Sequence, residues 1–234
     1  YSPGYTLGTL LYYIVSPFSA ILVPTLVELH NAGKEPLIKN HMDHILNYLI
    51  LILVPGVFGI SILAEQILLL LTTDQIASQS YIIAPFTALS MLFLGLGSLL
   101  SAILQLHKET GLISKAWLVA AIVNLGLNIL IIPLLGIIGA AITTLIAYTL
   151  LFYFIYYYTS KIVCISIDRS RLLKSIFSSC IMVGVLYFLL RNSVLCLPLL
   201  VLVGVLVYLV AIVALKGVEF REIMEIKNLL WRLS

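Results

Sequence analysis

Charged residues are scarce in this chain. Asp, Glu, Lys and Arg together make up 10% of its 234 residues, whereas 62% of the residues are hydrophobic. A soluble domain of this size needs more charge to cover its surface, so the composition excludes one. The mean hydropathy of +1.17 instead indicates a protein that crosses a membrane several times.

Cysteine is also rare, and the sequence contains no nucleotide-binding signature. The three cysteines, Cys164, Cys180 and Cys196, are expected at three different membrane levels, which excludes a disulfide framework or a cysteine metal cluster. A Gly-rich loop ending in Gly-Lys-Ser/Thr is missing, so ATP hydrolysis is not expected. We predict no catalytic residues and no cofactor.

Long apolar runs fill most of the chain. Because about 20 apolar residues cross a bilayer as a helix, we predict seven spans. Runs such as 49–54 do not alternate between polar and apolar residues as barrel strands do, so the prediction is an all-α, polytopic membrane helix bundle. The predicted spans are 5–27, 43–63, 82–104, 112–133, 136–158, 173–190 and 197–215.

The positive charges fall in alternate gaps between these runs. Twelve of the 13 Lys and Arg residues lie in the first, third and fifth gaps or in the tail, and only Arg191 lies in an even-numbered gap. Cytoplasmic loops collect Lys and Arg, so we predict that these gaps and the C-terminus are cytoplasmic. The net charge of +3 is then a signal of topology and gives no indication of nucleic-acid binding.

This topology places residue 1 outside the cell. The chain begins with Tyr1 and no signal peptide precedes the first span, so we expect the C-terminal part of a longer protein. A separately encoded subunit or a misread first span are the alternatives. Residues 1–215 are predicted to form the bundle. Residues 216–234 are predicted to form a cytoplasmic tail with helically spaced apolar residues. A short helix over 64–71 is expected to lie on the outer membrane surface.

Prolines recur within the apolar runs. An interior proline removes a backbone donor and tends to kink a helix, and broken helices are common in transporters. The alternative is that proline is simply more frequent in membrane helices. The predicted kink positions are Pro17, Pro24, Pro55, Pro85 and Pro133.

A tight outer turn is predicted between the fourth and fifth spans, near Pro133 and Gly136. Before it, Asn124 and Asn128 lie four residues apart and share a helical face. An amide exposed to lipid would lack partners, so we expect the pair to face the bundle interior or a cavity. Packing between helices is the plainer explanation of the pair.

Several segments together resemble the multidrug/oligosaccharidyl-lipid/polysaccharide flippase superfamily. They are the Gln105 span end with its basic loop, the Asn-x-x-x-Asn span, Ile-Pro-x-x-Gly-Ile-x-Gly-Ala-Ala over 132–141, Gly4-Tyr5 with Val23-Pro24 and Gly33, and Val54-Pro55-Gly56. The polysaccharide flippases are the branch that the chain resembles most. The resemblance implies one lobe of a two-lobed, MATE-like transporter, with the other lobe in the N-terminal half.

The function that the resemblance implies is the movement of a lipid-linked oligosaccharide across the cytoplasmic membrane by alternating access. Its partners would be the lipid-linked sugar, membrane lipids and the N-terminal lobe. A cation-coupled multidrug exporter is the first alternative, although no acid lies mid-span to couple the cation. A membrane enzyme acting on glycans is the second, but the outer loops offer few acids or bases. The candidate cavity residues are Asn124, Asn128, Gln105, Tyr12, Tyr13, Ser98 and Ser101.

Histidines give the nearest approach to a metal motif. His41 and His44 flank Asp43, but a metal needs three or four converging ligands, and no partner cluster is visible. His30 and His107 also fall at cytoplasmic span ends, yet nothing in the sequence brings them near one another. We therefore predict no metal site.

Overall fold

In a computed structural model, helices and the short turns between them make up nearly all of the described residues, 1–191 and 196–217. The helices are α1 (Ser2–Asn31), α2 (Glu35–Leu71), α3 (Asp74–Ser80), α4 (Ala84–Leu106), α5 (Thr110–Ile162), α6 (Arg169–Arg191) and α7 (Leu197–Ala214), with a 3₁₀ turn at Tyr81–Ile83. The chain forms two compact units, Tyr1–Ile167 and Asp168–Ser234, which divide the span region that the sequence analysis treats as a single bundle.

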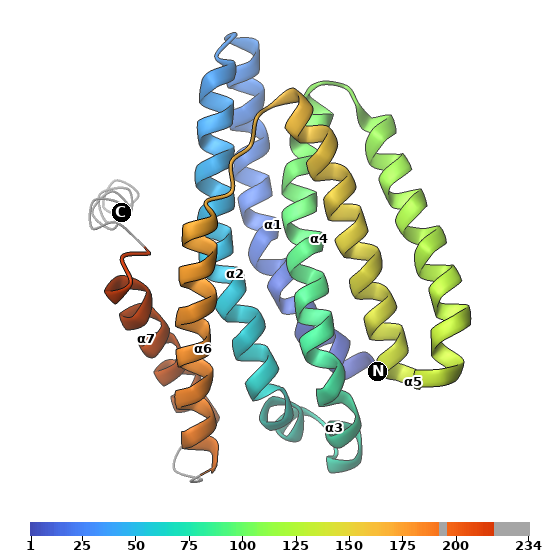
Figure 1. Cartoon of the computed structure of the whole chain (residues 1–234), viewed down its shortest axis with the longest axis vertical. Coiled ribbons are helices and arrows are strands. Elements are labelled where there is room, and N and C mark those ends of the chain that lie inside the picture. The colour runs from blue at the N-terminus through green and yellow to red at the C-terminus, as the bar shows by residue number, and fades with distance from the viewer. Residues whose placement is uncertain (192–195, 218–234) are drawn as a thin grey trace. The chain divides into compact units, whose positions relative to one another are not determined.

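Helix α4 is the centre of the first unit. It packs most extensively against α1 and α5, and Figure 1 shows it between them. Its polar residues Thr87 and Ser90 are fully buried. The Thr87 hydroxyl lies 3.2 Å from the carbonyl of Gly4 on α1, so the two helices approach closely at this point.

Glycines on α1 make this approach feasible. A Cβ atom at Gly8 would lie 2.6 Å from the Thr87 hydroxyl oxygen, and one at Gly4 would overlap the Ser80 carbonyl. A side chain at Gly8 would push α1 away from α4, and one at Gly4 would push α1 away from Ser80 and Ile83, just before α4. Small residues at crossings of membrane helices serve this purpose in general.

The eight prolines divide evenly between helix starts and helix interiors. Pro3, Pro36, Pro85 and Pro198 lie within the first two positions of α1, α2, α4 and α7, where proline removes no helical hydrogen bond. Pro85 was predicted to kink a helix, and this is wrong, because it begins α4 after the 3₁₀ turn. The other four predicted kink prolines do lie inside helices, and Figure 1 shows α1 and α2 changing direction along their length.

Helix α5 is a hairpin of two arms. Gly136 has φ 58° and ψ −133°, a conformation that interrupts the helix between residues 110–135 and 137–162. A straight helix of its 53 residues would be about 80 Å long, far more than the ~30 Å of a bilayer core. In Figure 1 the chain reverses direction here, which confirms the predicted turn after Pro133.

Six helices in the described residues are long and apolar enough to cross a membrane. The difference from the seven predicted spans lies in α5, which holds two arms. The expectation of a separate short helix over 64–71 is wrong, because these residues are the last part of α2. Ala64 and Leu68 are buried there against Leu7, Ala77 and Ala84, whereas Leu70 and Leu71 are exposed. The position of this segment at the outer membrane surface stays a prediction.

The described part of the second unit is an antiparallel pair, α6 and α7. The Asp168 carboxylate accepts hydrogen bonds from the backbone N–H groups of Ser170 (2.9 Å) and Arg171 (3.2 Å), which caps the start of α6. Between the helices, Ser175 and Tyr208 share a buried hydrogen bond of 3.0 Å. The predicted amphipathic tail lies almost entirely outside the described residues.

Candidate functional site

Polar side chains join the two arms of α5 near its turn. The Asn128 amide nitrogen donates to the Asn124 side-chain oxygen at 2.9 Å, and the Asn128 oxygen accepts a hydrogen bond from Thr143 at 2.5 Å. Asn124 and Asn128 are half-buried, while Thr143 is fully buried. The predicted asparagine pair therefore faces the opposite arm, and its amides have partners within the protein.

This network follows from the geometry of the hairpin. Asn128 precedes Gly136 by eight residues and Thr143 follows it by seven, so the two lie at the same depth on antiparallel arms. Thr143 can also donate to the Ala140 carbonyl at 3.0 Å, which keeps its hydroxyl satisfied when Asn128 moves. The Asn128–Thr143 contact can thus open without leaving the threonine unpaired.

The predicted serines of α4 are bonded locally. Ser98 donates to the Gly95 carbonyl at 2.8 Å, and Ser101 donates to the Ser98 carbonyl at 2.6 Å. Gln105, which is exposed, donates to the Ser101 hydroxyl at 3.4 Å. These three residues form a polar row on one side of α4. Gln105 at the end of that row is the member open to an outside partner.

The two predicted tyrosines of α1 have different surroundings. Tyr13 is 66% exposed on the helix surface. Tyr12 is half-buried and belongs to a group in which Tyr148 of α5 interacts with Tyr1, Tyr5 and Tyr12. Burial raises the pKa of the Tyr1 phenol above its ordinary value, and a hydrogen bond with Thr144 acts against this shift. Aromatic hydroxyls thus line the contact between α1 and the second arm of α5.

The histidines around Asp43 do not converge on a metal. The Asp43 carboxylate accepts hydrogen bonds from the backbone N–H and the hydroxyl of Ser166, both at 2.8 Å. His41 is bonded to the Leu37 carbonyl, and His44 stacks on Tyr48. Asp43 therefore fixes the segment that follows α5.

Comparison with known proteins identifies the family. The family model described as lipid II flippase MurJ matches residues 9–194. The chain belongs to this family. It is thus a multi-pass membrane protein of a transporter family, which confirms the flippase resemblance and agrees with the expectation that the chain is not an enzyme.

Two individual proteins agree with the assignment to the MurJ family. Residue identity is 23% over 169 residues with a protein described as a probable low-salt glycan biosynthesis flippase, Agl15, of Haloferax volcanii, covering 72% of this chain and 36% of that protein. A solved structure titled lipid II flippase MurJ, inward closed conformation, has a TM-score of 0.67 at 20% identity, covering 87% of this chain and 46% of the other. The MurJ-family chain therefore spans less than half the length of either protein, and the solved structure shares its helical fold.

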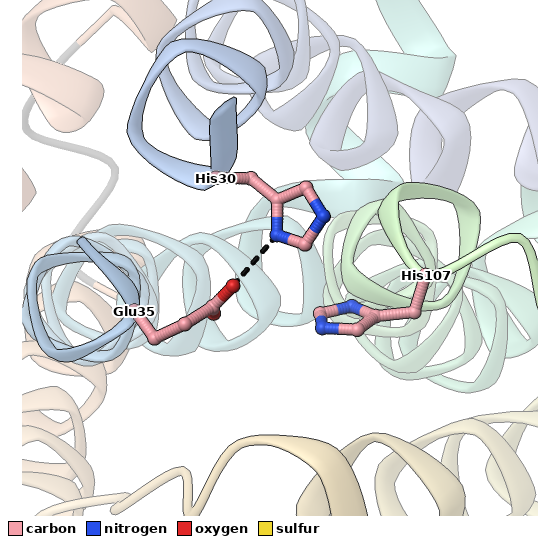
Figure 2. A group of neighbouring side chains, drawn as sticks. All are labelled: His30, Glu35 and His107. Atoms are coloured by element: carbon pink, nitrogen blue, oxygen red, sulfur yellow. Dashed lines mark hydrogen bonds and ion pairs between the residues drawn. The ribbon is translucent and has the colours of Figure 1, made fainter. Parts of the chain in front are cut away.

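One group of residues in this MurJ-family chain was missed by the sequence analysis. His30, Glu35 and His107 lie together where α1 ends, α2 begins and α4 ends, and one potential ligand atom from each lies within 4.8 Å of the others (Figure 2). The expectation that nothing brings His30 and His107 together is wrong, because the packing of α1 against α4 aligns their ends. Thr143 and Tyr148 were also missed as site residues. The only signal for Thr143 was that it follows Gly136 by seven residues, close to the eight by which Asn128 precedes it.

Proposed function

We propose that this chain forms one lobe of a flippase that moves a lipid-linked oligosaccharide across the cytoplasmic membrane. The match of residues 9–194 to the MurJ family supports this proposal most directly. The names of the related proteins, a lipid II flippase and a glycan biosynthesis flippase, suggest a polar sugar head on a lipid carrier. The other lobe would be the N-terminal half of the same protein.

Transport in this proposal consists of exposing a polar cavity to each side of the membrane in turn. The lipid tail of a sugar-diphosphate carrier stays in the bilayer, so only the polar head group must leave water and enter the cavity. The row of Ser98, Ser101 and Gln105, and the hydroxyls around Tyr12, are the polar surfaces that this lobe would contribute. Interior prolines in α1 and α2 give these helices points at which they can bend.

A diphosphate needs positive partners, and this lobe offers few. Arg and Lys are the usual phosphate ligands, but in the described residues they lie in loops or near helix ends. We infer that the N-terminal lobe supplies the cations that meet the diphosphate inside the cavity. A lobe with hydroxyls and amides but no central cation would contact the sugar.

The test is reconstitution into liposomes with a fluorescent lipid-linked oligosaccharide. The chain alone and the protein extended by its N-terminal half are compared for exposure of the label to an added quencher. We expect flipping by the extended protein and none by the chain alone, since a cavity between lobes requires both. Equal flipping by the two would contradict the two-lobe proposal. Failure of the extended protein to move this lipid, with export of cationic dyes instead, would favour the drug exporter.

A further inference from the structure

A compact group of metal-ligand side chains joins three helix ends. The Nδ1 atom of His30 lies 2.6 Å from the Oε1 atom of Glu35, and the rings of His30 and His107 meet edge to face with centroids 5.1 Å apart. Figure 2 shows the three side chains converging from three separate ribbons. The His30 and Glu35 side chains are 36% and 47% exposed, so an ion from solvent can reach them.

The orientation of His107 suits a ligand. Its Nδ1 atom lies 3.0 Å from the carbonyl oxygen of Ile103, and a carbonyl can only accept a hydrogen bond. Nδ1 therefore carries the proton of the neutral ring, and the lone pair is on Nε2. Histidines that bind metals commonly donate their other ring N–H to a backbone carbonyl in this way, which fixes both the tautomer and the ring.

The backbone beneath both histidines is held by the same type of helix end. After α1, the N–H of Lys34 bonds to Leu29 at 2.9 Å and that of Gly33 bonds to His30 at 3.0 Å. This pattern is a Schellman motif, with Gly33 at φ 67°. Because only three residues separate α1 from α2, the turn places Glu35 directly beside His30.

The end of α4 repeats the motif. The N–H of Glu109 bonds to Leu104 at 2.8 Å and that of Lys108 bonds to Gln105 at 3.0 Å, with Lys108 at φ 61° where glycine is usual. His107 is the capping residue between them. The ligand group thus rests on two defined turns, and its geometry does not depend on a long loop.

We propose that His30, Glu35 and His107 form a Zn²⁺ site. Two imidazoles and one carboxylate, with a fourth position open to water, are an established zinc donor set. Atoms bound to one tetrahedral zinc at about 2.0–2.1 Å lie about 3.3 Å apart. Binding would therefore widen the 2.6 Å contact of His30 with Glu35 and narrow any separation near the 4.8 Å limit. The bound ion links the ends of α1, α2 and α4.

This site is independent of the proposed transport function and has its own readout. The test uses the purified chain in detergent, prepared without a histidine tag and with Cys164, Cys180 and Cys196 replaced by serine. These three thiols are exposed and would bind zinc themselves. Isothermal titration with Zn²⁺ alone, and the thermal unfolding temperature with and without Zn²⁺, are measured. We expect one bound ion and a higher unfolding temperature.

Variants at the ligand positions separate a site from incidental binding. His30→Ala and His107→Ala should each weaken Zn²⁺ binding at least about tenfold, and Glu35→Gln should also weaken it. His107→Cys keeps a zinc ligand and should retain binding, which controls for folding defects in the alanine variants. His41→Ala and His44→Ala are the matched controls, because both histidines lie outside the group, and they should bind as the parent does.

Two results would overturn the proposal. In the first, the parent chain binds no Zn²⁺ up to millimolar concentration. The group would then be only an ion pair of His30 with Glu35, with His107 beside it. In the second, Zn²⁺ binds but His30→Ala, His107→Ala and His44→Ala bind it equally well, and the ion lies elsewhere.

Discussion

At the residue scale, one hydrogen bond joins two otherwise apolar helix arms, that between Asn128 and Thr143. Each residue also has a partner on its own arm, Asn124 for Asn128 and the Ala140 carbonyl for Thr143. Hydrogen bonds inside membrane proteins contribute only about 0.6 kcal/mol on average, because the unfolded helices in the bilayer also find partners. Their role in specifying which faces of two arms meet can exceed their contribution to stability.

A double-mutant cycle on this pair tests its strength. Asn128→Leu and Thr143→Val each remove one side of the contact, and the double variant removes both. We expect a coupling free energy of about 0.6 kcal/mol, and no more than about 1.7 kcal/mol, from unfolding in mixed micelles. Asn128→Leu with Ser160→Ala is the control pair, since Ser160 bonds to its own helix at Tyr156. Coupling as large in the control pair would show that the measured value is not specific to the contact.

Replacing both asparagines distinguishes packing from transport. In the extended protein, Asn124→Leu with Asn128→Leu is measured for folded yield and for movement of the lipid-linked oligosaccharide. Lost transport at normal yield would place the pair in the cavity. Reduced yield with unchanged activity per folded molecule would assign it to packing, which its bond to Thr143 favours. Normal yield with normal transport would refute both roles.

At the scale of elements, the crossing of α1 and α4 depends on glycine. Gly8→Ala places a methyl group 2.6–2.7 Å from atoms of Thr87, a residue that is fully buried and has no space to move into. Overpacking of this kind costs about 1–3 kcal/mol. We expect a correspondingly lower unfolding temperature, measured by circular dichroism or by fluorescence of a cysteine-reactive dye.

Gly111→Ala is the matched control for the crossing. Gly111 is also helical, but a Cβ atom there meets nothing within 4 Å. Alanine at a helical position without a clash is favoured over glycine by roughly 0.5–1 kcal/mol, so this variant should be as stable as the parent or more stable. Equal losses from both substitutions would mean that the close contact of α1 with α4 is not the cause.

The hairpin of α5 depends on backbone conformation at one residue. Gly136 has a positive φ with an extended ψ, a region that residues with a side chain rarely adopt. Gly136→Ala should therefore cost on the order of 1–3 kcal/mol, although its Cβ atom would meet nothing. Gly126→Ala, in open space on the straight first arm, is the control. If Gly136→Ala and Gly126→Ala had the same unfolding free energy, the strain assigned to Gly136 would be wrong.

Most of the helices could be predicted from the sequence, because the lengths of the apolar runs and the turn residues between them indicate where helices begin and end. The break at Gly136 follows from Pro133 and two clustered glycines. The surface helix over 64–71 could not be judged, since its amphipathic pattern fits a membrane surface and a neighbouring helix equally well. Pro85 was misjudged because the start of α4 had no other signal. The group of His30, Glu35 and His107 required knowing that α1 lies beside α4, which periodicity does not reveal.

At the scale of the whole molecule, the direction of successive helices agrees with the alternating charge pattern. In the first unit, the turn between α1 and α2 and the turn between α4 and α5 lie at one end, and the N-terminus and the turn within α5 lie at the other (Figure 1). The first and third gaps therefore lie at the same end of this unit, as the distribution of Lys and Arg predicts. Which side faces the cytoplasm rests on the charges alone.

Cysteine labelling determines the orientation. In a background without native cysteines, Asp74→Cys and Arg169→Cys introduce one thiol each, both at exposed positions. A membrane-impermeant maleimide added to intact cells should modify position 74 and spare position 169, because positive charge marks the cytoplasmic side. Permeabilised cells, in which both should react, are the control. Modification of 169 and protection of 74 would invert the topology.

The hairpin of α5 also has a consequence for biogenesis. The first arm carries two amides that a lone helix would expose to lipid, whereas the residue that pairs with Asn128 is only 15 positions later, past a short turn. The two arms can therefore leave the translocon together, with the amide already paired. The translocon would then release this segment late, after both arms are made, and a released chain that ends between Gly136 and Thr143 should have a poorly integrated first arm.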